Sequence, residues 1–150
     1  MKPIGILVIK LSNRGPFPVY NDSIIDLEVS MKLGITGLTL RSLGESEEEK
    51  QDEQFFRLIG PIPVPDIPEY CALGMAFAFD VEVNENEYFE SFGIWMIIDS
   101  DYKDNIYQNY DKIQQLLIDF IKTYQNEEEL NNGIKINAFK NNFLRQIPFQ

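Results

Sequence analysis

Apolar and polar positions alternate with different periods along the chain, and the changes of period divide it into elements. The first apolar run, Ile4–Lys10, is short and rich in β-branched residues, which predicts a strand covered on both faces. Asn13–Pro16 is typical of a turn, because glycine accepts a positive φ and proline fixes the exit. Phe17–Tyr20 then predicts a second, short strand that pairs back on the first.

A long helix is predicted next. Ser23 is its expected N-cap, with Asp26 three residues later in a variant of the capping box, and Gly44 is a natural C′ residue. Apolar residues recur at spacings of three and four and form one stripe of this helix: Ile24, Leu27, Met31, Ile35 and Leu38.

Two glycines, Gly34 and Gly37, lie inside this helix, where each costs about 1 kcal/mol relative to alanine. The favoured interpretation is a close approach of the helix to the sheet. The alternative is a flat surface on which the backbone of a partner docks.

The middle of the chain combines an acidic segment with a proline-rich one. Glu45–Gln54 holds six acidic residues and one lysine, and a solvated connector is favoured over a site for a basic partner. Phe55–Ile59 predicts a third strand. Gly60–Pro68 contains four prolines in nine residues, so it is expected at a sheet edge or in a loop, because proline has no N–H for a ladder.

Two further strands follow. Met75–Val83 alternates, with its larger apolar side chains on one face, and Phe92–Asp99 is apolar on both faces, as a central strand is. The aromatic residues of these strands are expected in the core and not in a ligand-binding box: Phe77, Phe79, Phe92 and Trp95.

A second helix is predicted from Asp104, its expected cap, over about 20 residues. Its apolar stripe is Ile106, Tyr110, Ile113, Leu117, Phe120 and Tyr124. The asparagine-rich tail, 126–150, is expected to be a C-terminal extension that packs as a short helix on a domain formed by 1–125. Its apolar anchors are Leu130, Ile134, Phe139, Phe143, Leu144 and Ile147.

The predicted order is therefore β-β-α-β-β-β-α, with an additional terminal element. The fold class is α+β: a five-stranded antiparallel sheet, with two helices covering one face.

Composition narrows the chemistry. The chain has 150 residues, 13 basic against 24 acidic, a net charge of −11, one cysteine and no histidine. A Ser-His-Asp triad, a Cys-His pair, a histidine metal site and an internal disulfide are therefore excluded. The negative charge disfavours nucleic acid and anionic membranes as partners. Since no run of about 18 apolar residues occurs, no transmembrane segment is predicted, and a cytoplasmic location is expected.

Few residues suggest catalysis or metal binding. Asp99–Asp104 has the spacing of the start of an EF-hand loop, but Asp104 and Tyr110 stand where that loop needs Gly and Glu. A strand-to-helix turn is therefore expected there. No phosphate-binding glycine loop occurs, and Cys71 is expected to be a plain, buried or half-buried thiol. No cofactor or metal is predicted.

The order of elements resembles the longin domain, the fold of longin SNAREs, adaptor small subunits and sedlin-type trafficking proteins, within the longin, roadblock and profilin-like group. The resemblance covers nearly the whole chain and rests on topology: the hairpin Ile4–Tyr20, the helix Ser23–Leu43, the hairpin Leu73–Asp99 and the helix Asn105–Tyr124. The roadblock fold begins with a helix, whereas this chain begins with a strand. Because no SNARE heptads follow, membrane fusion is not implied.

This resemblance implies a non-catalytic interaction module that binds a small GTPase, as in related archaeal proteins, or a second longin-type domain, including a second copy of the chain. The expected partner-binding residues lie on the first helix and the strand edge beside it: Met31, Gly34, Ile35, Gly37, Leu38, Phe55, Phe56 and Arg57. Two alternatives stay open. One is a small-ligand sensor with a cavity between sheet and helices, and the other, with the least weight, is an enzyme that uses a carboxylate of raised pKa.

Overall fold

The computed structural model describes residues 4–12, 14–44, 57–78 and 91–148. Its five strands are β1 (Gly5–Ser12), β2 (Gly15–Asn21), β3 (Ile59–Val64), β4 (Ile67–Phe77) and β5 (Ser91–Asp99). They form one sheet in the order β2-β1-β5-β4-β3, and all neighbours are antiparallel. The α+β class, the antiparallel sheet and the central place of the last strand are confirmed.

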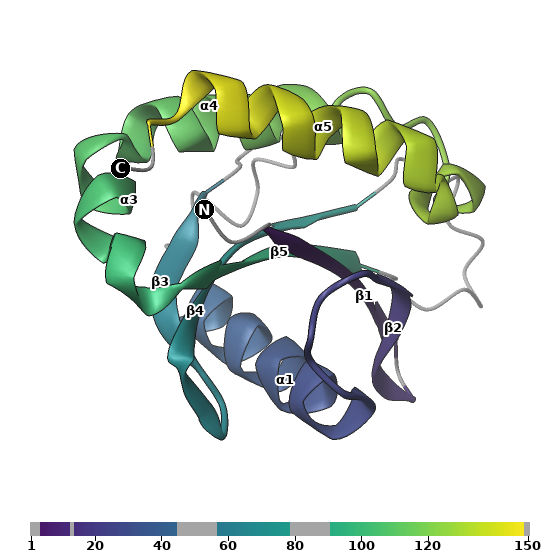
Figure 1. The fold of residues 1–150 in the computed structure, drawn as a ribbon. Coiled ribbons are helices and arrows are strands. Elements are labelled where there is room, and N and C mark those ends of the chain that lie inside the picture. Colours follow the sequence, from purple (N-terminus) through teal and green to yellow (C-terminus); the bar gives the residue numbers. More distant parts are fainter. Residues whose placement is uncertain (1–3, 13, 45–56, 79–90, 149–150) are drawn as a thin grey trace.

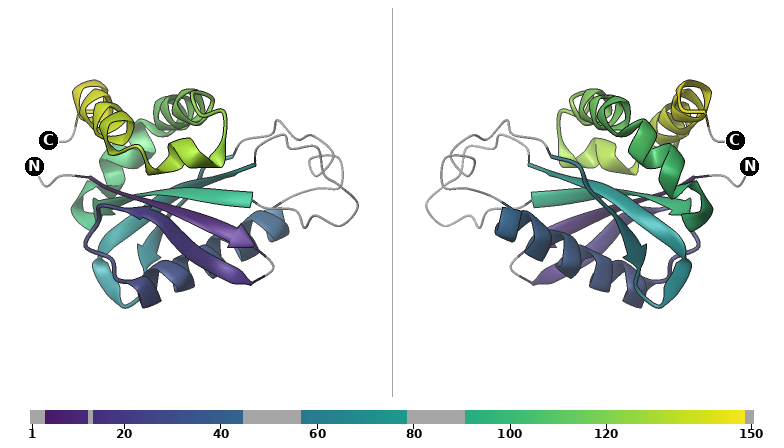
Figure 2. Two further views of the ribbon diagram at one scale, coloured as in Figure 1. Left: turned by 90° about the vertical axis from the view of Figure 1, so that its right-hand side faces the viewer. Right: turned by 90° about the vertical axis from the view of Figure 1, so that its left-hand side faces the viewer.

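Helices cover both faces of this sheet (Figure 1). The helix α1 (Leu27–Gly44) lies on one face. The opposite face carries the helical elements that follow β5, as the turned views show (Figure 2): η1 (Ser100–Tyr102), α3 (Lys103–Gln108), α4 (Tyr110–Ile121), η2 (Glu127–Asn131) and α5 (Gly133–Gln146). The prediction of two helices on one face is therefore wrong. The physical reason is that β1 and β5 are apolar on both faces, so each face needs a cover.

Each face has its own core. Beneath α1 the core contains Leu7, Ile9, Ile25, Val29, Leu33, Trp95 and Ile97. The larger core on the other face joins β-strand residues to α3, α4 and α5 and includes Ile6, Met75, Phe77, Phe92, Ile113, Leu117, Phe139 and Phe143. Phe77 and Phe92 stack at 5.6 Å between ring centroids. Of the four aromatic residues predicted to lie in the core, Phe77, Phe92 and Trp95 are buried. The fourth, Phe79, lies outside the described residues.

The proline-rich segment forms the edge strand β3 and the turn after it. The predicted strand Phe55–Ile59 is thus placed too early, since β3 begins at Ile59. Asp66, with φ of 66°, turns the chain into β4, which begins eight residues before the predicted start at Met75. The alternating pattern did not indicate this earlier start, because the first four residues of β4 are exposed or half-buried and show no regular alternation.

The helix predicted from Asp104 over about 20 residues is divided into two helices, α3 and α4. Asn109, with φ of −116° and ψ of 20°, interrupts it, and its backbone N–H donates to both Asn105 and Ile106 carbonyls. Asp104 is not the cap. A 3-10 turn precedes the helix, and the Asp99 carboxylate caps that turn by accepting from Asp101 N–H at 3.0 Å. The predicted apolar stripe is nevertheless buried, except for the half-buried Tyr110.

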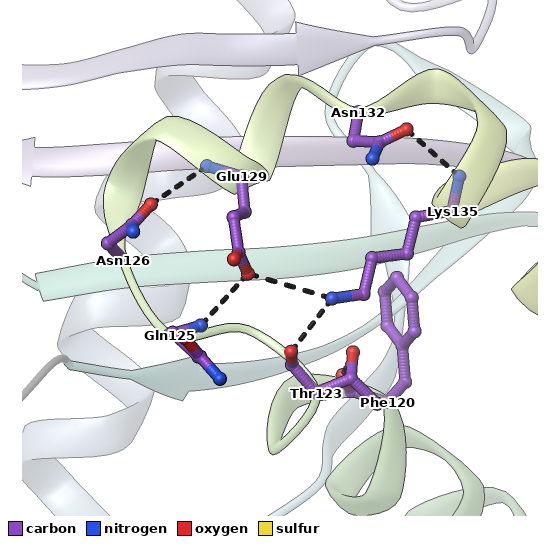
Figure 3. Close-up of polar contacts among 7 residues, drawn as sticks. All are labelled: Phe120, Thr123, Gln125, Asn126, Glu129, Asn132 and Lys135. Carbon is purple, nitrogen blue, oxygen red and sulfur yellow. Dashed lines mark hydrogen bonds and ion pairs between the residues drawn. The ribbon is translucent and has the colours of Figure 1, made fainter.

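The tail folds as the helix α5, and Phe139, Phe143 and Ile147 are buried as predicted, whereas Ile134 is 85% exposed. Polar contacts fix its start (Figure 3). The Lys135 ammonium donates to the Thr123 carbonyl at 2.8 Å, lies 3.7 Å from the Glu129 carboxylate and sits 4.3 Å above the Tyr124 ring. Because Phe143 and Ile113 of α4 belong to one core, α5 is packed on the domain. The boundary at residue 125 stays a prediction.

Candidate functional site: an apolar row on α1

An apolar row lies on the outer face of α1 and the turn before it. The exposed fractions of its members are 62% for Ile24, 60% for Leu27, 39% for Met31 and 55% for Ile35. These are four of the seven large apolar side chains that are exposed in the described part of the chain. The last three are spaced four residues apart, so they form one ridge along the helix. We call these four residues the α1 row.

This stripe does not pack on the sheet. The residues that α1 and its preceding turn bury are instead Ile25, Val29 and Leu33, together with Ser30. Both sets repeat every three or four residues, so periodicity alone does not distinguish them. The side chain of Leu38, the last member of the expected stripe, lies outside the described residues.

The turn before α1 fixes which face is buried. Asp26, not Ser23, caps the helix, since its carboxylate accepts from Val29 N–H at 2.9 Å. Ser23 instead donates to the Asn21 side chain at 2.6 Å, and the Asn21 amide donates to the Ile25 carbonyl at 2.8 Å. These bonds point Ile25 inward and leave Ile24 exposed.

Gly34 and Gly37 face the sheet and are buried. A Cβ on Gly34 would lie 2.8 Å from Pro16 Cβ, and one on Gly37 would overlap the indole ring of Trp95. The close approach of helix and sheet is therefore confirmed. The alternative, a flat docking surface made by these glycines, has no support from their burial.

Of the remaining expected partner-binding residues, the structure describes the side chains of Met31, Ile35 and Arg57. Met31 and Ile35 belong to the α1 row. Arg57 is half-buried just before β3, and Phe55 and Phe56 lie outside the described residues, as does the acidic segment Glu45–Gln54. Sequence reasoning placed Ile24 and Leu27 in the same helix stripe as Met31 and Ile35 but did not include them among the partner-binding residues.

Charged side chains border the α1 row. The Lys32 ammonium pairs with the Asp66 carboxylate at 2.7 Å and lies 3.7 Å from that of Glu28. The hydrogen bond to Asp66, and then its charge, raise the pKa of Lys32. Glu28 and Asp66 are 79% and 63% exposed at their side chains, and Asp26 is exposed too. The Lys32 ammonium thus lies beside two carboxylates, and a third, Asp26, caps the N-terminal end of α1.

Both edges of the sheet contain prolines. β2 carries Pro16 and Pro18, and β3 carries Pro61 and Pro63. Because proline has no N–H, neither edge can offer an added strand a full row of donors. The exposed apolar ridge of α1 is therefore better suited to docking than either edge.

A small apolar pocket lies beside Trp95, between α1 and the sheet, and its walls include Ile9, Gly34, Gly37 and Ile59. Its volume of about 10 Å³ is room for one water molecule. Trp95 fills the space beneath the glycines of α1, so this pocket does not favour a small-ligand sensor.

The other chemical candidates show no activated group. Asp99–Asp104 is a strand-to-helix turn, as predicted, and the part of the chain that the structure describes holds no group of three residues suited to a metal ion. Burial raises the pKa of the Cys71 thiol to about 11, so it is protonated at neutral pH. Within the described residues, no helix is long and apolar enough to cross a lipid bilayer.

Comparisons with known proteins agree with this fold. No protein-family profile matches the sequence, and no curated protein matches it either. Among solved structures, the K. lactis Lst4 longin domain is similar, with a TM-score of 0.53 and 12% sequence identity, over 96% of this chain and 93% of that one. At this identity the likeness concerns the fold alone. The chain therefore has a longin-like fold, as its order of elements indicated.

Proposed function

We propose that this protein is a non-catalytic interaction module and that the α1 row is its docking surface. The observation that carries the proposal is the clustering of exposed aliphatic side chains from Ile24 to Ile35 on one ridge of one helix. Single exposed apolar residues are normal on a protein surface, whereas a contiguous set marks a binding site.

The longin-like fold supports this assignment, since the longin resemblance implies a partner-binding platform. Its implied partners are a small GTPase or a second longin-type domain, in a trafficking-like or regulatory complex. Catalysis by the thiol has no support from the site, because the Cys71 side chain is buried and its pKa is raised.

The test is size-exclusion chromatography with light scattering on the full chain, alone and mixed with candidate small GTPases in each nucleotide state or with longin-type domains. We expect a complex that Leu27→Glu and Ile35→Glu abolish, because a charge would be buried in the interface. The matched control is Ile134→Glu on α5, which changes an even more exposed isoleucine and should leave the complex intact.

The proposal fails if the wild-type chain stays a monomer that binds none of these proteins. It also fails if a complex forms and both α1 variants retain it at wild-type affinity.

A further inference from the structure

Resting on the proposed function, we infer that the occupant of the α1 row is an amphipathic α-helix with an apolar stripe flanked by Lys or Arg. The helical shape of the occupant and its positive charge both follow from the side chains on and around α1.

The shape of the surface favours a helix. Leu27, Met31 and Ile35 form a ridge with four-residue spacing, and such a ridge packs into the groove between the ridges of another helix. An extended segment would instead need the N–H donors of a sheet edge. Prolines at alternate positions, 16 and 18 on β2 and 61 and 63 on β3, remove donors from both edges.

The length of the surface agrees with a helix. From Leu27 to Ile35 the ridge covers a little over two turns, on the order of 12 Å at 1.5 Å per residue. Ile24 extends it at the N-terminal end, where the chain enters α1. A helix of three or four turns would therefore cover the α1 row from end to end.

The charge of the flank favours a basic occupant. Glu28 and Lys32 are the charged side chains of α1 between Leu27 and Gly37, and Lys32 is already paired with Asp66 and Glu28. With Asp26 at the cap, the flank carries three carboxylates against one ammonium. A Lys or Arg on the incoming helix would be attracted to Glu28 and Asp66, and a glutamate there would be repelled.

The same charges disfavour a second copy as the occupant. A second α1 row would bring its own Glu28 and Asp26, and each chain carries a net charge of −11. Repulsion between two such surfaces is strongest at low ionic strength.

The test uses the full chain, labelled with ¹⁵N, and three synthetic helical peptides of roughly 18 residues, long enough to hold helical structure. All three have the same Leu stripe. One has Lys on both flanks, one has Glu, and the third is the Lys peptide with a central proline that breaks the helix. Titrations followed by amide chemical shifts give both the affinity and the surface contacted.

We expect the Lys peptide to bind at least about tenfold more tightly than the Glu peptide at low salt, with a difference that shrinks as salt is added. The proline peptide should bind weakly. Leu27→Glu should weaken binding of the Lys peptide at least about tenfold, Glu28→Lys should reverse the preference, and Ile134→Glu should leave both unchanged.

Equal binding of the Lys and Glu peptides, no binding of either, or shifts centred on β2 or β3 would overturn the inference. So would a homodimer that Leu27→Glu dissociates, because the occupant would then be a second copy. If a GTPase complex depends on Leu27 and the peptides show no charge preference, the inference fails and the proposed function stands. If the peptides behave as expected and no protein partner depends on α1, the proposed function fails instead.

Discussion

Gly37 of α1 lies directly against the indole ring of Trp95 on β5, so closely that a Cβ on the glycine would overlap Cζ2 of the ring. Two strand glycines complete the space around this ring. A Cβ on Gly74 would overlap its benzo half, and one on Gly93 would lie 3.3 Å from Nε1. The single tryptophan of the chain thus lies between helix and sheet in a space that three glycines leave open.

Gly37→Ala should therefore destabilise the fold by roughly 1–3 kcal/mol, although alanine is the better helix former, because the added methyl group forces α1 away from Trp95. The free energy of unfolding, measured in urea with Trp95 fluorescence as the signal, checks this. Gly133→Ala is the matched control, since its Cβ meets nothing closer than 3.9 Å, and it should leave the free energy unchanged or slightly raised. Equal effects of the two substitutions would contradict the close contact.

The burial register of α1 can be tested with two truncations two residues apart. Leu33 is 0% exposed and Ile35 is 55% exposed. Leu33→Ala should cost roughly 2–5 kcal/mol, because it leaves a cavity beneath the helix. Ile35→Ala should change the free energy of unfolding by no more than about 0.5 kcal/mol. The reverse order in chemical denaturation would contradict this burial register.

The contacts of Lys135 hold the start of α5 to the end of α4. Lys135→Met keeps the apolar stem and removes the ammonium that bonds to the Thr123 carbonyl and lies near Glu129. We expect a loss of roughly 0.5–1.5 kcal/mol in the free energy of unfolding and faster amide exchange at the start of α5. Lys122→Met, at an exposed position at the end of α4, serves as the control and should change neither.

The Tyr124 hydroxyl is buried and, among the described residues, has no hydrogen-bond partner. Tyr124→Phe removes that buried polar group, so stability at neutral pH should stay equal or rise by about 1 kcal/mol. Thermal unfolding at pH 7 measures this, and a clear loss of stability would contradict the absence of a partner.

Because of the same hydroxyl, we expect the free energy of unfolding to depend on pH in the alkaline range. Burial, and then the charge of Glu129, raise the pKa of Tyr124 from 10.0 to about 12. Because the pKa of Tyr124 is higher in the folded state than in the unfolded state, titration of this hydroxyl leaves the free energy of unfolding unchanged below pH 10. The free energy of unfolding then falls as the pH rises from 10 towards 12. Tyr124→Phe should therefore lose less stability than the wild type between pH 10 and 12. Tyr20, whose pKa is also raised to about 12, keeps part of the slope in both proteins.

Much of the architecture was predictable from the sequence because it depends on local pattern. The run Ile4–Lys10 forms the interior strand β1, and the doubly apolar Phe92–Asp99 forms the central strand β5. The stripe from Ile106 to Tyr124 is buried, apart from the half-buried Tyr110, although Asn109 interrupts the helix. Hydrophobic periodicity identifies such elements since each of them presents one dominant apolar pattern.

What the sequence determined by itself was the set of elements, their order, the longin-like topology and the lack of histidine chemistry. Only the tertiary structure decided which face of α1 is buried, because Ile25, Val29 and Leu33 compete with Ile24, Leu27, Met31 and Ile35 at nearly the same spacing. Contacts distant in sequence settled that competition. Trp95, which lies 58 positions after Gly37, leaves room only for a helix face lined by glycine. The aliphatic ridge of α1 therefore faces outward.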